Sequence, residues 1–64
     1  MDYQLFDTQT TAKFLNVSYA TLRGLMKRGE ITYHRIGKTS IRFTKDDLRE
    51  FLERTAERAE VNHV

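Results

Sequence analysis

The chain contains no cysteine among its 64 residues. This excludes disulfide bonds, thiolate metal sites and a cysteine nucleophile, and it suits a reducing cytoplasm, where we expect the protein to act. No apolar run approaches the roughly 20 residues that cross a bilayer. The first residues also lack the basic stretch and apolar core of a signal peptide, so we expect neither membrane insertion nor secretion.

Residues arranged for catalysis are also scarce. The sequence has no glycine-rich phosphate loop and no activated-serine motif. His34 falls on the packed face of an expected strand, where we interpret it as a core histidine with satisfied hydrogen bonds, and His63 lies in the C-terminal tail. Asp46 and Asp47 fit the start of a helix, where capping accounts for both carboxylates. We therefore expect no enzyme activity, no cofactor and no metal site.

The length allows a single small domain, because a chain near 60 residues buries only about 60% of the surface that its unfolded form exposes. The hydrophobic fraction of 39% and the charged fraction of 31% are typical of a globular protein rather than of a disordered tail. We expect one domain over residues 1–64, with flexible ends at 1–4 and 60–64.

The net charge of +2 is distributed unevenly along the sequence. Residues 1–17 carry −1, residues 18–45 carry +6, and residues 46–64 carry −3. A basic middle between acidic ends is the electrostatic pattern expected of a nucleic-acid-binding protein. A solvated surface with chance clustering is the alternative, so the positions of the charges must decide.

The N-terminal half predicts two helices joined by a tight turn. Asp7 is the expected N-cap of the first helix, which ends at Asn16 in the left-handed conformation. Ser18 then caps a second helix over 19–28, which Gly29 terminates. Over the two helices and the turn, the sequence places a small residue, a left-handed residue and inward-facing aliphatic residues in the order that two closely crossing helices require. These residues are Ala12, Asn16, Val17, Leu22 and Leu25. This spacing fits a helix-turn-helix, although a purely structural helix pair uses some of the same residues.

The C-terminal half predicts a hairpin followed by the longest helix. Residues 31–36 and 41–43 favour strands, with a four-residue loop at 37–40. This loop length places Ile36 opposite Ile41, His34 opposite Phe43, and Arg35 opposite Arg42. Residues 44–47 resemble a capping box, and apolar residues continue at helical spacing from 48 to 59.

The exposed face of the second helix is small and basic. Its members are Ala20, Arg23, Gly24 and Lys27. A helix that enters a major groove roughly 12 Å wide needs short side chains where it sits closest and long donors where it reaches guanine or phosphate. Gly24 costs about 1 kcal/mol relative to alanine, which indicates that some backbone approaches closely there. Tyr19 flanks this face and suits a thymine methyl, a phosphate or packing on the hairpin. A neighbouring protein segment fits the same face as well as DNA does.

The hairpin carries a second group of candidate anion-binding residues. Arg35 and Arg42, if paired across it, repel each other unless an anion lies between or beside them, and phosphate is the natural candidate. Lys38 adds a cation at the tip, and Thr39 and Ser40 add hydroxyl donors, where a wing meets the DNA backbone or the minor groove. The alternative is a solvated hairpin whose arginines point apart.

The span from Leu5 to Leu52 resembles the small excisionase-type and AlpA-like winged helix-turn-helix domains, which are related to the DNA-binding domain of MerR regulators. The resemblance is carried by AKFLNVS at 12–18, LMKRGEI at 25–31, RIG at 35–37 and RFTKDDLREFL at 42–52. It implies an α+β fold, in which the helix beginning at Ser18 reads the major groove and the 37–41 hairpin is the wing. Asn16 and Thr32 stand where the family often has glycine and proline. Gly24 replaces a larger polar or basic residue, which leaves open which side chains read bases.

The residues expected to bind DNA are Ser18, Tyr19, Ala20, Thr21, Arg23, Gly24, Lys27, Arg28, Arg35, Lys38, Thr39, Ser40 and Arg42. The resemblance implies a recombination directionality factor, which bends DNA beside an integrase and favours excision of a phage or mobile element. It equally implies a small transcription regulator of the same element. We favour the first, because the sequence ends soon after the winged domain. A protein-interaction module that docks a partner through its acidic last helix is a third interpretation.

The expected partners are double-stranded DNA, an integrase and further copies of this chain that load cooperatively on DNA. One winged module contacts too few base pairs to specify a single binding site in a genome. The last helix offers a mixed-charge surface for such contacts, with the next copy's basic hairpin or with an integrase: Arg49, Glu50, Glu53, Arg54, Glu57 and Arg58. Exposed ion pairs are weak, so we expect a monomer in the absence of DNA.

Overall fold

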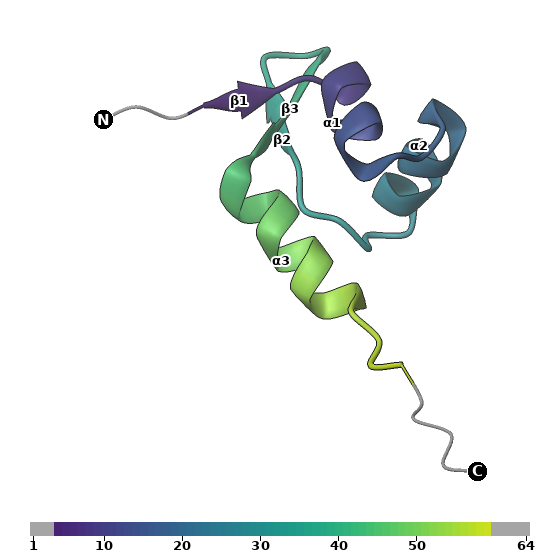
Figure 1. Cartoon of the computed structure of the whole chain (residues 1–64). Helices are drawn as coiled ribbons and strands as arrows, with labels where there is room; N and C mark the ends of the chain where they lie inside the picture. Colours follow the sequence, from purple (N-terminus) through teal and green to yellow (C-terminus); the bar gives the residue numbers. More distant parts are fainter. Residues whose placement is uncertain (1–3, 60–64) are drawn as a thin grey trace, which may run out of the picture.

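The computed structural model describes residues 4–59 and contains three helices and a small antiparallel sheet within that span (Figure 1). The elements in chain order are β1 (Leu5–Phe6), α1 (Thr8–Leu15), α2 (Tyr19–Lys27), β2 (His34–Ile36), β3 (Ser40–Thr44) and α3 (Lys45–Thr55). The strand order is β1-β3-β2, so β3 is central. The layout confirms the expected α+β winged helix-turn-helix. The expected flexible ends, 1–4 and 60–64, lie outside the described residues except for Gln4.

The core is built from one buried apolar side chain in each of five segments of the chain. These are Ala12 from α1, Leu22 from α2, Ile31 from the following loop, Phe43 from β3 and Leu48 from α3. Leu22 and Phe43 are both fully buried. Because all three helices and the central strand contribute to the same small cluster, the helices and the hairpin are held against one another by shared packing rather than by separate cores.

Local signals in the sequence account for the helix-turn-helix. The Asp7 carboxylate accepts a hydrogen bond from the Thr10 N–H at 2.8 Å, and Ser18 Oγ accepts one from the Thr21 N–H at 3.1 Å. Asn16 adopts the left-handed conformation, with φ 58° and ψ 44°. The Val17 N–H then reaches back to the Ala12 carbonyl at 3.0 Å. Both expected N-caps and the left-handed asparagine are therefore confirmed, and the turn is closed by its own backbone.

The predicted first strand is wrong over residues 31–33, since only His34–Ile36 pairs with β3. Ile31 turns into the core, and Tyr33 packs against Phe43 with ring centroids 6.4 Å apart. The segment is held by α3 instead of by a strand: Arg54 Nη2 donates to the Glu30 carbonyl, and Thr32 Oγ1 donates to Glu50 Oε1 at 3.2 Å. The apolar residues of this segment therefore pack against the core and do not form the hydrogen-bond ladder of a strand.

The predicted hairpin register is wrong by one residue. Ser40 belongs to β3 rather than to the loop, so the pairs are Ile36 with Ser40, Arg35 with Ile41, and His34 with Arg42. Gly37 begins the shorter loop with φ 73°, a conformation that glycine adopts without steric cost. The side chains of two paired residues point to the same face of a sheet, and neighbours along a strand point to opposite faces. Since Arg35 now pairs with Ile41, Arg35 and Arg42 lie on opposite faces.

His34 is consequently not a core histidine. Its side chain is 50% exposed, and its Nε2 lies 3.0 Å from Asp47 Oδ2 at the start of α3. The expected capping box is confirmed, because Thr44 and Asp47 exchange hydrogen bonds of 2.9 and 3.0 Å. Thr44 is also the last residue of β3, where it pairs with Leu5 of β1. The sheet therefore leads into α3 without a connecting loop.

Helix α3 ends at Thr55, four residues before the predicted end at 59. The Thr55 hydroxyl donates to the Phe51 carbonyl at 2.8 Å, and residues 56–59 are exposed. Helical periodicity alone does not hold a final turn that has no packing partner. Strand β1 was not predicted, because two residues are too short to show an alternating pattern.

Candidate nucleic-acid interface

The buried side of α2 fixes the direction of its exposed side. Leu22 is fully buried, Leu25 and Met26 are half-buried against the core, and Ala20, Arg23 and Lys27 are exposed on the opposite side. Residues three and four apart share a helix face, so the exposed side is the small and basic face expected from the sequence. This face projects from the core instead of packing on another element.

Tyr19 positions the guanidinium of Arg23. Arg23 Nη1 donates to the Tyr19 hydroxyl at 3.3 Å, and the guanidinium carbon lies 5.8 Å from the centre of the ring. The two residues are one helical turn apart, which allows this contact on a helix surface. Tyr19 thus restricts the arginine that projects from the middle of α2, a role that sequence reasoning did not assign to it.

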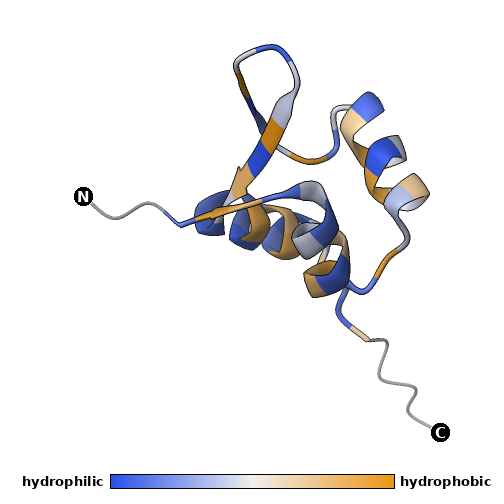
Figure 2. Ribbon diagram, turned by 90° about the horizontal axis from the view of Figure 1, so that it is seen from above, coloured by the Kyte–Doolittle hydropathy of each residue, from blue (hydrophilic) through white to orange (hydrophobic). Residues whose placement is uncertain are grey.

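A groove of about 480 Å³ separates α2 from the β2–β3 hairpin. Figure 2 shows the hairpin and α2 projecting on the same side, away from α1 and α3. The groove is lined by Thr8, Tyr19, Arg23, Met26, Lys27, Tyr33, Arg35, Lys38, Thr39 and Ile41. Four of these residues are basic and none is acidic. The surface between helix and hairpin is therefore electropositive.

The four cations of this basic groove carry no ion pair within residues 4–59. The ion pairs there instead join Arg28 to Glu30, Arg49 to Asp46 and Arg54 to Glu50. The Asp47 carboxylate lies against His34. Arg35 Nη1 donates to the Lys38 carbonyl at 3.4 Å, which ties the arginine to the hairpin loop without neutralising its charge. Uncompensated cations in a groove attract polyanions and raise their rate of association.

Arg42 lies apart from the basic groove. Its Nη1 donates to the Ile41 carbonyl at 2.8 Å, and the register shift turns it to the face of His34. The pKa of the nearby Asp7 carboxyl is lowered by hydrogen bonds from the Thr10 backbone N–H and side chain, with smaller contributions from the charges of Arg42 and Lys13. The predicted phosphate site between Arg35 and Arg42 is thus wrong, since the two residues do not face each other.

Arg28 is also outside the basic groove, in an exposed ion pair of 2.7 Å with Glu30. Its guanidinium covers Gly24: a Cβ at position 24 would lie 3.0 Å from Arg28 Nη1. The three heavy atoms nearest to such a Cβ, apart from the neighbouring backbone of α2, all belong to the Arg28 side chain. The close backbone contact predicted at Gly24 is therefore not made within this span.

Only some of the residues predicted to bind DNA line the basic groove. Tyr19, Arg23, Lys27, Arg35, Lys38 and Thr39 line the basic groove. Ser18, Ala20, Thr21, Gly24, Arg28, Ser40 and Arg42 do not. Sequence reasoning missed four lining residues: Met26 of α2, Ile41 of β3, Thr8 of α1 and Tyr33 of the segment before β2. The position of Thr8 follows from helix-turn-helix geometry, in which the first helix crosses the nucleic-acid backbone.

Residues 4–59 contain no group of three His, Asp or Glu side chains placed to hold a metal ion. No helix in that span is long and apolar enough to cross a membrane.

Comparison with known proteins assigns most of the chain to one family. The model of a family described as a helix-turn-helix domain matches residues 5–56, most of the chain. Curated proteins and solved structures gave no match. The matched span includes both helices of the motif, the hairpin and all of α3. The chain belongs to the excisionase/AlpA-like helix-turn-helix family and has a DNA-binding domain of that type.

Proposed function

We propose that this protein is a sequence-specific architectural DNA-binding protein, the recombination directionality factor of a phage or mobile element. The observation that carries the proposal is the basic groove between α2 and the hairpin, with four cations and no carboxylate. Such a surface suits two neighbouring phosphate backbones and the base edges between them. Family membership supports DNA binding, and the excision role goes beyond it.

In the proposed complex, α2 enters the major groove and the hairpin is the wing. Ala20 offers a short side chain where the helix sits closest, and Arg23 and Lys27 extend from the same exposed face. Tyr19 holds the Arg23 guanidinium and so reduces the conformational freedom that it loses on binding a guanine. Lys38 and Thr39 contact phosphate from the wing, while Arg35 faces the helix across the basic groove.

Specificity in this proposal comes from several copies on adjacent sites. A single module of this kind buries about 600–1,000 Å² and discriminates over few base pairs. Copies that contact one another on DNA, or an integrase bound beside them, supply the remaining selectivity. A transcription regulator of the same element would use the same groove, so the DNA-binding surface does not separate the two roles.

The salt dependence of DNA affinity tests the binding mode. About four to six phosphate contacts give a log–log slope of about −4 to −5 for the observed binding constant against salt. The variant with both Arg35→Ala and Lys38→Ala should flatten the slope by about two units. Arg58→Ala removes an exposed cation beyond α3 and serves as the control with an unchanged slope. An affinity that does not change between low and moderate salt would refute the proposed DNA complex.

An excision assay in vitro tests the biological role. The protein is added to an integrase and a DNA substrate carrying the attachment sites of its element. Stimulated excision supports the directionality factor. DNA binding with no effect on excision, together with altered transcription from a nearby promoter, supports the regulator instead.

A further inference from the structure

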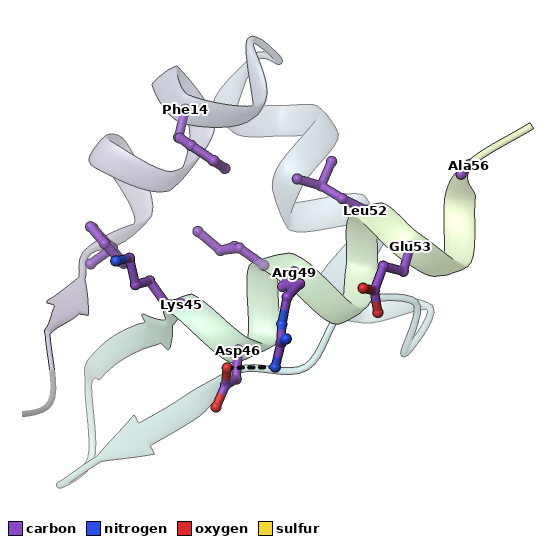
Figure 3. Close-up of a pocket in the computed structure, with 9 residues that line it drawn as sticks. Phe14, Lys45, Asp46, Arg49, Leu52, Glu53 and Ala56 are labelled. Atoms are coloured by element: carbon purple, nitrogen blue, oxygen red, sulfur yellow. Dashed lines mark hydrogen bonds and ion pairs between the residues drawn. The ribbon is translucent and has the colours of Figure 1, made fainter.

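A second groove, apolar and of about 720 Å³, lies between α1 and α3 (Figure 3). Its lining residues are Phe6, Phe14, Lys45, Asp46, Leu48, Arg49, Leu52, Glu53 and Ala56. None of them lines the basic groove. Figure 3 shows Phe14 from α1 and Leu52 from α3 pointing into the space between the two helices. An occupant of this apolar groove therefore leaves the DNA-binding residues uncovered.

The apolar groove exposes side chains that a small protein normally covers. Phe14 is 63% exposed and Leu52 is 46% exposed. Full burial of such a side chain contributes about 1.5–3 kcal/mol, so two of them beside one hollow favour association. Phe14 sits in a short helix that needs packing to remain helical, and its exposure has no structural benefit within the described chain.

The charges at the rim select the kind of occupant. Lys45 lies in the first turn of α3 and Glu53 lies two turns later, about 12 Å further along the axis. Neither has an ion-pair partner within residues 4–59, whereas Asp46 and Arg49 between them pair at 3.0 Å. An antiparallel helix of reversed charge order complements this rim. A second copy of α3 meets that requirement, because its Glu53 reaches Lys45 while its own Lys45 reaches Glu53.

We propose that the apolar groove is a self-association surface, in which two copies of this chain pack their α3 helices antiparallel about a two-fold axis near Arg49. Such an interface is isologous, so one complementary pair of charges is used twice. Each copy's Leu52 enters the groove of the other and covers Phe14. The opposite side of α3 is less available, because Glu50 pairs with Arg54 at 3.6 Å and accepts from Thr32 at 3.2 Å.

The expected dimer is weak in the absence of DNA. One helix and one groove bury less than the roughly 800 Å² per partner of a standard stable interface. A dissociation constant of about 0.1–1 mM follows, which matters when two copies are held close together. The association itself requires no DNA, so its failure and the failure of the proposed function are measured separately.

Sedimentation equilibrium and NMR titration of the full chain up to about 1 mM test the proposal. We expect the mean mass to rise towards that of a dimer, with concentration-dependent shifts confined to α3 and the region of Phe14. Leu52→Glu and Phe14→Ser should each abolish both effects. Ile36→Ser is the matched control, because Ile36 is 50% exposed on the hairpin and lines neither groove.

Charge reversal identifies the two-fold arrangement. Lys45→Glu and Glu53→Lys should each weaken association roughly tenfold, since each change affects both symmetric contacts. Both changes favour the α3 dipole, so neither is expected to impair folding. The double variant should restore association. A chain that stays monomeric at the highest concentration, or a double variant that fails to recover, would overturn the proposal and leave the groove to a different protein.

Discussion

His34 Nε2 and Asp47 Oδ2 lie 3.0 Å apart, and the same carboxylate oxygen accepts the Thr44 backbone N–H at 2.9 Å. A single atom of α3 thus joins the outer strand of the hairpin to the helix cap. Asp47 is nearly buried, whereas His34 is half exposed, so the two residues contribute unequally. The cap is the structural part of this contact, and the histidine reinforces it.

Substitutions at these two positions should differ in size. His34→Ala removes one exposed partner and is expected to lower the free energy of unfolding by less than about 1 kcal/mol. Asp47→Ala also removes the capping box and should cost about 1–2 kcal/mol. Urea denaturation of both variants measures the difference. Equal losses would mean that the contact between His34 and Asp47, rather than the cap, holds the start of α3.

Thr11→Val should stabilise the protein. The Thr11 side chain is fully buried, and its hydroxyl has no hydrogen-bond partner within the described chain. Replacement by an apolar group of the same shape removes this desolvation cost, so we expect a gain of about 1 kcal/mol. Thr44→Val is the matched control, since the same chemical change there removes a cap and should destabilise. A loss at position 11 in urea denaturation would show that its hydroxyl is satisfied.

The pH dependence of stability should include a contribution from Asp7, whose pKa is lowered chiefly by hydrogen bonds from Thr10. A carboxyl with a lowered folded-state pKa stabilises the fold above its unfolded value near 3.9. That contribution is lost as the pH falls through the lower folded value. Asp7→Asn keeps an N-cap without a charge, so its unfolding curve should show less acid dependence. Identical pH profiles for the two proteins between neutral and acidic pH would contradict this assignment.

Gly24→Ala should separate stability from DNA binding. A methyl group at position 24 meets only the end of the flexible Arg28 side chain, so we expect a gain of up to about 1 kcal/mol from helix propensity. If α2 lies close to the floor of the major groove, the same change weakens DNA affinity. Thermal unfolding and DNA titration on one preparation measure both effects. Unchanged affinity would place the closest approach of α2 elsewhere.

Arg23→Ala and Lys38→Ala should weaken DNA binding in different ways. Arg23 is held by Tyr19 on the exposed face of α2, and its loss should cost about 1–3 kcal/mol on the specific site only. Lys38 lies in the hairpin loop, and its loss should weaken all sequences alike and reduce the salt slope by about one unit. Arg42→Ala is the comparison outside the basic groove. An unchanged ratio of specific to nonspecific binding for Arg23→Ala would place base readout on other residues.

The sequence predicted best those features that depend on a few adjacent residues. The caps at Asp7, Ser18 and Thr44 and the left-handed Asn16 are each decided by local hydrogen bonds, and all four are confirmed. The basic face of α2 followed from helical spacing around the buried Leu22. Local chemistry therefore specifies the helix-turn-helix.

Features that depend on packing between distant segments were predicted less well. One residue in the loop length decides whether Arg35 faces Arg42 or Ile41, and no local signal fixes that length. The early end of α3 and the packing of Ile31 depend on which surfaces meet. The apolar groove was not predicted, because its exposure is visible only after Phe14 and Leu52 are placed side by side.

Thr44 is both the last residue of β3 and the N-cap of α3, so no linker separates the two elements. The hairpin and α3 are therefore expected to move as one unit. A flexible joint would let α3 rotate independently of the hairpin. In the proposed DNA complex, the direct connection would instead fix the orientation of α3 relative to the hairpin and hence to the DNA. Two copies joined through α3 would then hold their DNA sites at one rotational setting. Moving the sites apart by half a helical turn, about 5 base pairs, would set them on opposite faces of the duplex and out of phase.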